Sequence, residues 1–106
     1  MRSNPLLRGL AATHPGEILR EDVLPALGRP KAEIARLLGI SRQQLYDILE
    51  ERKPITVPMA LRIGKLCGNG PGLWIRLQQS YDIERAEHDL ADVLERIPTL
   101  EAVEAA

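Results

Sequence analysis

Residues 31–49 read KAEIARLLGISRQQLYDIL, and they place four residue types at the spacing that two crossing helices need. Counted from the first of them, Ala35 is fifth and Gly39 is ninth. A small side chain lets the helices approach each other, and a glycine can adopt the positive φ that ends a helix. Leu45 and Ile48, fifteenth and eighteenth, would hold the second helix against the core. The stretch therefore predicts a helix-turn-helix.

The second helix of this motif has a defined start and a defined inner face. Ser41 is a good N-cap, so the helix is expected to begin directly after it. On a helical wheel of about 100° per residue, Leu45, Ile48 and Leu49 share the side that faces the core. Gln43 lies almost opposite them, on the side that would face solvent or a ligand.

The first turn of this helix carries side chains that can read DNA. Arg42 can pair with guanine, and Gln43 and Gln44 can each pair with adenine. The N-terminal end of the second helix is also the end that enters a major groove, with Tyr46 beside it. Asp47 and the acidic residues after it oppose phosphate, so we expect only the first turn and Tyr46 to penetrate deeply.

Three basic residues flank the motif where phosphates would lie. Lys31 starts the first helix, and Arg52 and Lys53 follow the second. In isolation the polar run at 42–44 would be more typical of an ordinary solvated helix face. Their place in a fitted helix-turn-helix is what favours DNA contact.

Helix signals on both sides of the motif predict an all-α chain. Residues 14–17, HPGE, mark a helix start, because proline suits the first helical position and an early glutamate favours the helix dipole. Pro25 should bend or shorten that helix. Thr56 caps a helix that runs to Cys67, and a turn at 68–71 leads into another.

The C-terminal part of the chain has a different character. From Ile83 to Ile97 apolar residues recur at spacings of three and four on an otherwise acidic helix, which Pro98 should end. This stripe packs either on its own domain or against a partner. We expect a mobile N-terminal segment (1–12), a compact five-helix domain (13–83), and an acidic C-terminal helix and tail (84–106).

The net charge of −1 hides a segregation of charge along these 106 residues. Residues 29–65 hold eight basic and four acidic side chains, whereas residues 66–106 hold three basic and eight acidic ones. A basic middle and an acidic end suggest two surfaces with different partners, although unevenly charged solvated faces would look the same. No apolar run is long enough for a membrane span, and one cysteine allows no internal disulfide, so we expect a cytoplasmic protein.

Other reactive residues have simpler interpretations. His14, before a proline, indicates a helix start, and no nucleophile or third group accompanies it. His14, Cys67 and His88 lack metal-ligand spacing, and Cys67 is most simply a small core residue. Trp74 is expected in the core with one edge facing a partner subunit. We therefore predict no enzyme activity, metal or cofactor.

With these residues in view, the chain resembles the HigA-type antitoxins of the phage-repressor-like helix-turn-helix group. The resemblance spans roughly residues 13–83 and rests on HPGEILRE (14–21), PKAEIARLLGISRQQLYDILEERKPIT (30–56) and ALRIGKLCGNGPGLWIRLQQSYDI (60–83), in that order. Two departures, Arg29-Pro30 and Gly70 where capping residues are usual, bear on the helix boundaries.

The resemblance implies a repressor-like five-helix domain that forms a homodimer. Such a dimer binds double-stranded operator DNA upstream of its own operon and neutralises a HigB-like toxin, a ribosome-dependent mRNA endonuclease. The family's DNA-contacting positions fall on Ser41, Arg42, Gln43, Gln44 and Tyr46.

Two other functions stay open at this stage. A free-standing phage-type repressor without a toxin would have the same motif. A protein-interaction module that has lost DNA binding is suggested by the acidic residues Asp47, Glu50 and Glu51. If a toxin is present and basic, the acidic region after Ile83 is the surface that would meet it.

Overall fold

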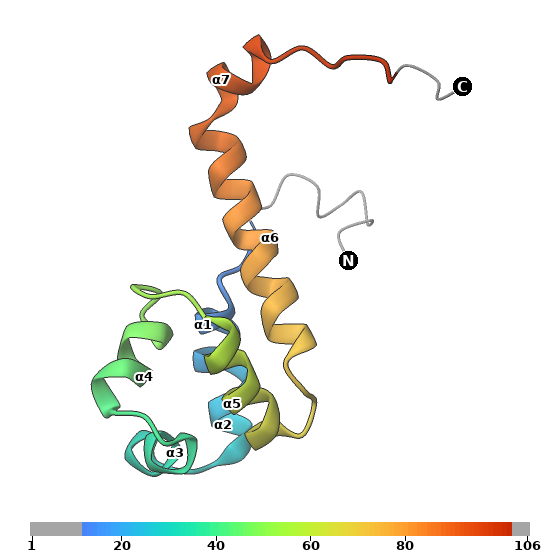
Figure 1. Cartoon of the computed structure of the whole chain (residues 1–106). Coiled ribbons are helices and arrows are strands. Elements are labelled where there is room, and N and C mark those ends of the chain that lie inside the picture. The colour runs from blue at the N-terminus through green and yellow to red at the C-terminus, as the bar shows by residue number, and fades with distance from the viewer. Residues whose placement is uncertain (1–11, 103–106) are drawn as a thin grey trace.

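The computed structural model describes residues 12–102, which form a bundle of helices and a projecting arm (Figure 1). Helices account for all the regular secondary structure of these residues, so the predicted all-α fold is confirmed. The elements are α1 (Pro15–Ile18), the π-helical η2 (Leu19–Val23), α2 (Leu24–Leu27), α3 (Lys31–Leu38), α4 (Arg42–Leu49), α5 (Val57–Cys67), α6 (Gly72–Asp89) and α7 (Ala91–Arg96).

The first three elements form one continuous helix with a π-helical middle. Pro25 has no N–H to donate, and its ring would crowd the carbonyl of Glu21 in an ordinary α-helix. The chain widens before the proline, and the N–H of Leu24 donates to the carbonyl of Leu19, five residues back. The expected bend or shortening is thus replaced by a π-turn, and the helix reaches Leu27 before Gly28 ends it with a positive φ of 65°.

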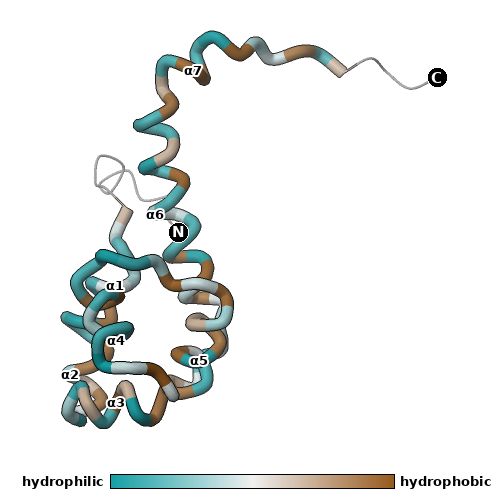
Figure 2. The backbone as a smooth tube through the Cα atoms, turned by 60° about the vertical axis from the view of Figure 1, so that its left-hand side comes forward, coloured by the Kyte–Doolittle hydropathy of each residue, from teal (hydrophilic) through white to brown (hydrophobic). Residues whose placement is uncertain are grey.

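One apolar core joins these helices. Its fully buried members include Ile34 of α3, Leu49 of α4, Ile63 of α5 and Trp74 of α6. Figure 2 shows that apolar residues recur between polar ones along the helices of the bundle. Trp74 is buried within its own chain and donates its indole N–H to Asn69 Oδ1 at 3.4 Å, so the prediction that one edge faces a partner subunit is wrong.

Two close backbone approaches fix how the helices pack. A Cβ on Gly16 would lie 1.9 Å from the carbonyl oxygen of Ile48, so α1 meets α4 backbone to backbone. A Cβ on Gly64 would lie 2.2 Å from the carbonyl of Gly70, so the turn after α5 folds back directly onto α5. Both glycines permit contacts that any side chain would obstruct.

The C-terminal part differs from the expectation of a separate acidic helix. α6 runs without a break through position 83 to Asp89, and the chain departs from helical geometry at Leu90, before α7. Figure 1 shows the second half of α6 and α7 extending away from the bundle. Every described residue from Arg85 onward is exposed, so this arm makes little contact with its own domain.

At the other end of the chain, Ala12 is buried, and its N–H donates to Glu84 Oε1 at 2.8 Å. The rest of the N-terminal segment predicted to be mobile, and the end of the C-terminal tail, lie outside the described residues. Ala12 itself thus contacts α6, and the mobility of the N-terminal segment stays a prediction.

Candidate nucleic-acid interface

The start of α4 is built as the motif predicted. Ser41 is the N-cap, and its Oγ accepts from the N–H of Gln44 at 3.0 Å. The Gln44 side chain completes a capping box, because its Oε1 accepts from the N–H of Ser41 at 2.9 Å. On the other side of the corner, Gly39 ends α3 with a φ of 73°. The corner between α3 and α4 is therefore fixed at both helix ends.

The predicted reading residues lie on the outer side of this helix. Leu45, Ile48 and Leu49 are buried, as the wheel predicted. The remaining polar residues of the first turn and the tyrosine of the second are exposed: Ser41, Arg42, Gln43, Gln44 and Tyr46. Gln44 has its amide oxygen engaged in the cap, which leaves mainly its NH₂ group for another partner.

We call the first turn of α4, residues 42–44, the reading turn. Asp47 connects it to the loop after α4. Its Oδ1 accepts from Gln43 Nε2 at 2.9 Å and from Arg52 Nε at 3.1 Å. The hydrogen bond from Gln43, together with Arg52 and Lys53, lowers the pKa of Asp47, so this carboxylate is ionised at neutral pH. The acidic residue that was expected only to oppose phosphate is thus already paired.

The loop after α4 folds back onto the last turn of the helix. Glu51 adopts a positive φ of 64°, and the N–H groups of Arg52 and Lys53 both donate to the carbonyl of Asp47, at 2.8 and 3.1 Å. The two basic side chains are exposed beside α4. Lys31 is exposed at the first position of α3, so the three predicted phosphate contacts flank the helix pair.

Side chains from outside the motif hold it in place, and these were not found from the sequence. Arg62 of α5 donates to the carbonyl of Leu38 at 2.7 Å, which caps the end of α3. The buried Gln78 of α6 accepts from the N–H of Ile55 at 2.7 Å and donates to Asp82 at 2.9 Å. Arg20 donates to the carbonyl of Leu49 and pairs with Glu51 at 3.3 Å. Their partners are mainly backbone atoms, which leave no signal in a sequence pattern.

His14 is a structural residue of the same region. It is buried, its Nδ1 accepts from the N–H of Gly16 at 2.8 Å, and its ring packs edge-on against Tyr81 at 4.9 Å. Burial lowers its pKa, partly offset by the charges of Glu51 and Asp82. This agrees with its interpretation as a helix-start residue.

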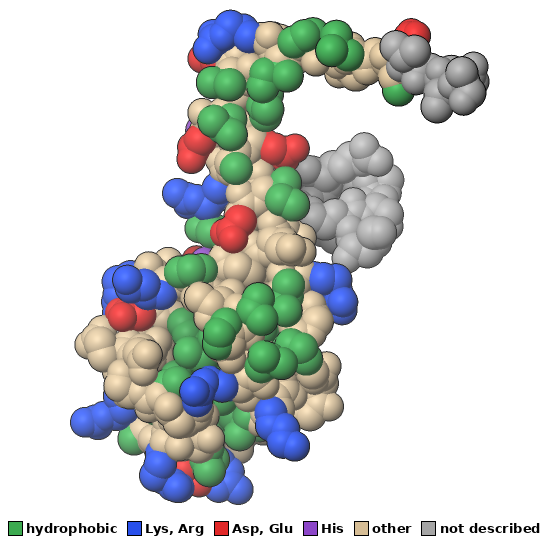
Figure 3. Space-filling view, in the orientation of Figure 1, with side chains coloured by type: hydrophobic (Ala, Val, Ile, Leu, Met, Phe, Trp, Pro, Cys, Tyr) green, Lys and Arg blue, Asp and Glu red, His purple; other side chains and the backbone are tan. Residues whose placement is uncertain are grey.

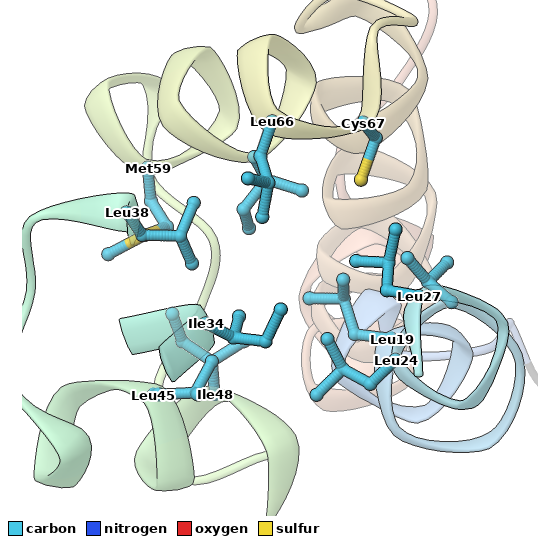
Figure 4. A pocket seen from close by; sticks show the side chains of 12 residues that line it. Leu19, Leu24, Leu27, Ile34, Leu38, Leu45, Ile48, Met59, Leu66 and Cys67 are labelled. Atoms are coloured by element: carbon cyan, nitrogen blue, oxygen red, sulfur yellow. The ribbon is translucent and has the colours of Figure 1, made fainter. Parts of the chain in front are cut away.

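Basic side chains surround the bundle, whereas the arm carries both acidic and basic ones (Figure 3). Figure 3 shows Lys and Arg side chains around the bundle end of the molecule and apolar patches along the arm. Figure 4 shows a small cavity in the core of the bundle, which is lined by apolar side chains such as Leu19, Ile34 and Leu45 and measures about 10 Å³. That is about the space of one water molecule, too small for a substrate.

The residues that the structure describes contain no group of His, Cys, Asp and Glu that could hold a metal ion. None of their helices is long and apolar enough to cross a membrane.

Comparison with known proteins identifies relatives of the whole fold. Virulence-associated protein I of Dichelobacter nodosus is 35% identical over 89 residues, which is 84% of this chain and 82% of that protein. The structure of the Pseudomonas aeruginosa antitoxin HigA with the higBA promoter is 31% identical, with a TM-score of 0.80 over 85% of this chain and 99% of that one. The chain belongs to the HigA family of antitoxins.

A second family member gives the same result. Antitoxin GraA in complex with its operator is 35% identical, with a TM-score of 0.80 over 89% of this chain and 96% of that one. No family model matches the sequence. The HigA-type fold is that of a DNA-binding helix-turn-helix repressor, and the relatives are antitoxins and transcriptional regulators rather than enzymes.

Proposed function

We propose that this HigA-family chain binds the operator of its own operon as a homodimer, represses transcription from it, and neutralises a HigB-like mRNA-endonuclease toxin. The observation that carries the DNA-binding half is the exposed first turn of α4. It presents Arg42 and Gln43 from a capped, rigidly held helix end, between basic residues on α3 and on the loop after α4. Polar side chains on a fixed helix end are what major-groove reading requires.

The reading turn of one chain covers only a few base pairs, which is why we include a homodimer. A two-fold dimer would place two α4 helices about one DNA turn apart, roughly 34 Å, on a pseudo-palindromic site. The basic residues Lys31, Arg52 and Lys53 would then contact phosphates on both half-sites.

A salt series tests the DNA-binding half. The duplex upstream of this chain's own reading frame should bind, and the logarithm of its affinity should fall linearly with the logarithm of the salt concentration. Replacing Lys31 and Lys53 by Ala should flatten that slope, because fewer counterions are released when phosphate contacts are removed. Binding that does not depend on salt would contradict this use of the surface and would favour a protein-interaction module instead.

For the toxin-binding half, the supporting observation is the arm. Its apolar side chains, among them Ile83, Leu90 and Ile97, are about half exposed, and acidic residues surround them. A contiguous apolar stripe without cover on its own chain is typical of an interaction surface. The acidic residues around the stripe favour a basic partner by charge complementarity. A toxin that acts on RNA would be basic.

Matched pairs of neutralising substitutions test this assignment. Glu87→Gln with Glu95→Gln removes two charges from the arm, and Glu17→Gln with Asp22→Asn removes two from the first helix. The toxin is taken as the product of the adjacent gene, co-expressed with this chain. The arm variant should bind it more slowly and more weakly at low salt, whereas the control should bind as the unmodified chain does.

Three outcomes would contradict the arm as the toxin site. The arm variant could bind as tightly as the unmodified chain, or only the control could lose affinity. Replacing Leu90 and Leu94 by Gln could also break the homodimer instead of the complex, which would make the stripe a dimer interface. If no neighbouring product is bound or neutralised in a growth test, the chain is a free-standing repressor, the alternative that the sequence left open.

A further inference from the structure

Asp47 is the acidic residue nearest the reading turn, and its contacts are unusual for a residue near DNA. Both of its side-chain hydrogen bonds are accepted by one oxygen, Oδ1, from Gln43 four residues earlier and from Arg52 five residues later. Its side chain is only 21% exposed, although it lies on the outer side of α4. The carboxylate therefore joins a predicted base contact to a predicted phosphate contact.

The bond from Gln43 fixes which way its amide points. A carboxylate has only acceptor atoms, so the amide must turn its NH₂ group toward Asp47. One N–H of that group is used in this bond, and the other N–H and Oε1 remain. To read adenine, glutamine donates one N–H to N7 and accepts at Oε1 from the N6 amino group. After this bond to Asp47, the amide still has one N–H and Oε1, which are the donor and the acceptor that a paired contact with adenine needs.

The bond from Arg52 to Asp47 likewise leaves other donors of the same side chain for DNA. Arg52 donates through Nε, which is the inner nitrogen of its guanidinium group. Its two terminal nitrogens make no hydrogen bond to any described residue. They can form a paired contact with a phosphate while Nε stays on Asp47. The pairing also offsets the negative charge that Asp47 would otherwise direct at the DNA.

We propose that Asp47 is a positioning residue, whose carboxylate holds the Gln43 amide in the orientation that reads adenine and holds Arg52 toward the phosphate backbone. This inference rests on the proposed operator binding and names the residue that sets its base preference. It predicts that an acidic side chain near the DNA increases specificity, although simple charge repulsion would predict only weaker binding.

Glu50 offers a matched control for the charge. It is exposed at the C-cap directly after α4, and within residues 12–102 its side chain forms no ion pair and no hydrogen bond. Asp47→Ala and Glu50→Ala each remove one negative charge, from α4 and from its C-cap respectively. Glu50→Ala should therefore bind random-sequence duplex as tightly as the unmodified chain or more tightly, since less charge opposes the phosphates. Asp47→Ala should bind it less tightly than Glu50→Ala, because it also releases Arg52 from its held orientation.

The two variants should differ in base preference. Selection from a randomised duplex library, followed by sequencing of the bound fraction, measures that preference at every position, whatever the operator sequence is. Asp47→Ala should lose preference for adenine at one position of each half-site by about fivefold or more, the lower end of what a paired contact supplies. Glu50→Ala should keep it, and Asp47→Asn, which retains an acceptor oxygen, should lie between them.

A double substitution shows whether Asp47 acts through Gln43. In a Gln43→Ala chain, the further change Asp47→Ala should leave the preference at that position unchanged, because the amide to be oriented is gone. Circular dichroism of each variant confirms that it is folded. Asp47→Ala with the same preference as Glu50→Ala would overturn the proposal while leaving operator binding in place. Gln43→Ala with an unaltered preference at every position would overturn the reading turn itself.

Discussion

At the scale of single residues, polar side chains fix the helix-turn-helix to the rest of the bundle. Arg62 reaches the last turn of α3, and Gln78 reaches the chain just after the α4 loop. Each binds a backbone group, the carbonyl of Leu38 or the N–H of Ile55, for which the helices provide no other partner. An unsatisfied buried backbone group costs about 1–3 kcal/mol, so such side chains decide whether the motif keeps one orientation.

Gln78 provides the direct test of this anchoring. Gln78→Ala leaves the N–H of Ile55 without its acceptor, and we expect a loss of about 1–3 kcal/mol in the free energy of unfolding. The neighbouring Gln79 is exposed, so Gln79→Ala should change that free energy by less than about 0.5 kcal/mol. Urea unfolding of the two variants measures the difference, and equal effects would argue against the anchor.

His14 makes stability depend on pH in a predictable direction. Its folded-state pKa is lowered by burial, so the unfolded chain binds a proton more readily than the folded one. The contribution of His14 to stability is therefore complete above its ordinary pKa of 6.5 and is lost as the pH falls through the lowered value. Protonation would also remove the acceptor for the N–H of Gly16.

His14→Asn isolates this effect, because asparagine still accepts a hydrogen bond at an N-cap but does not titrate in this range. We expect unfolding free energies measured from pH 7.5 down to about 5 to fall less steeply for His14→Asn than for the unmodified chain. If the unfolding free energy fell equally steeply with pH in the two proteins, His14 would not be the cause of that pH dependence.

Spacing and chemistry predicted most single residues of the site. The cap at Ser41, the buried Leu45 and the exposed Arg42 follow from local rules that act within one or two turns. The anchors Arg62 and Gln78 could not be predicted, because each occupies an ordinary helix position and its partner lies more than twenty residues away. Which residues contact DNA remains a prediction.

At the scale of elements, close packing of backbones sets the order of the helices. α5 and α6 are joined by a turn that folds back onto Gly64, where no Cβ fits. α1 touches α4 through Gly16 in the same manner. The first of these contacts fixes α6 against α5, and the second fixes α4 against α1 and leaves the outer side of α4 free.

Gly64→Ala should disturb the turn between α5 and α6. Its Cβ would lie 2.2 Å from backbone atoms of Gly70, which cannot move as a side chain can, and we expect destabilisation of about 1–3 kcal/mol or more. Gly72→Ala is the control, since its Cβ would meet only the mobile end of Arg76, at 3.1 Å. That change should be neutral or slightly stabilising in a helix. Thermal unfolding compares them, and a Gly64→Ala protein as stable as Gly72→Ala would contradict the packing described above.

Element boundaries were predictable only where a local signal marks them. Glycine ends α3 and α5, and Ser41 and Thr56 start α4 and α5, as expected. Residues 73–97 contain neither glycine nor proline, so nothing in the pattern marks the break at Leu90. The π-turn before Pro25 was also missed, because a proline signals a disturbed helix without saying how the chain adapts.

At the scale of the whole molecule, the chain divides into a bundle and an arm. The bundle carries most of the basic residues and the reading turn, and the arm carries acidic and apolar residues that its own domain leaves exposed. Composition predicted this separation of charge, but not the projection of the arm, which depends on α6 continuing beyond its last buried residue, Gln78. The surface proposed for DNA and the surface proposed for the toxin therefore lie on different parts of the chain.

The central claim is that the first turn of α4 reads the operator. Its most direct test is the affinity of Arg42→Ala for the duplex upstream of the reading frame, measured beside Arg96→Ala, which removes the same charge from the arm. Gln44 is left unchanged, because its side chain is part of the helix cap. We predict that Arg42→Ala loses about 1–3 kcal/mol of binding free energy and relaxes its base preference, while Arg96→Ala binds as before. Arg42→Ala with Gln43→Ala binding the operator as tightly as the unmodified chain would contradict the claim.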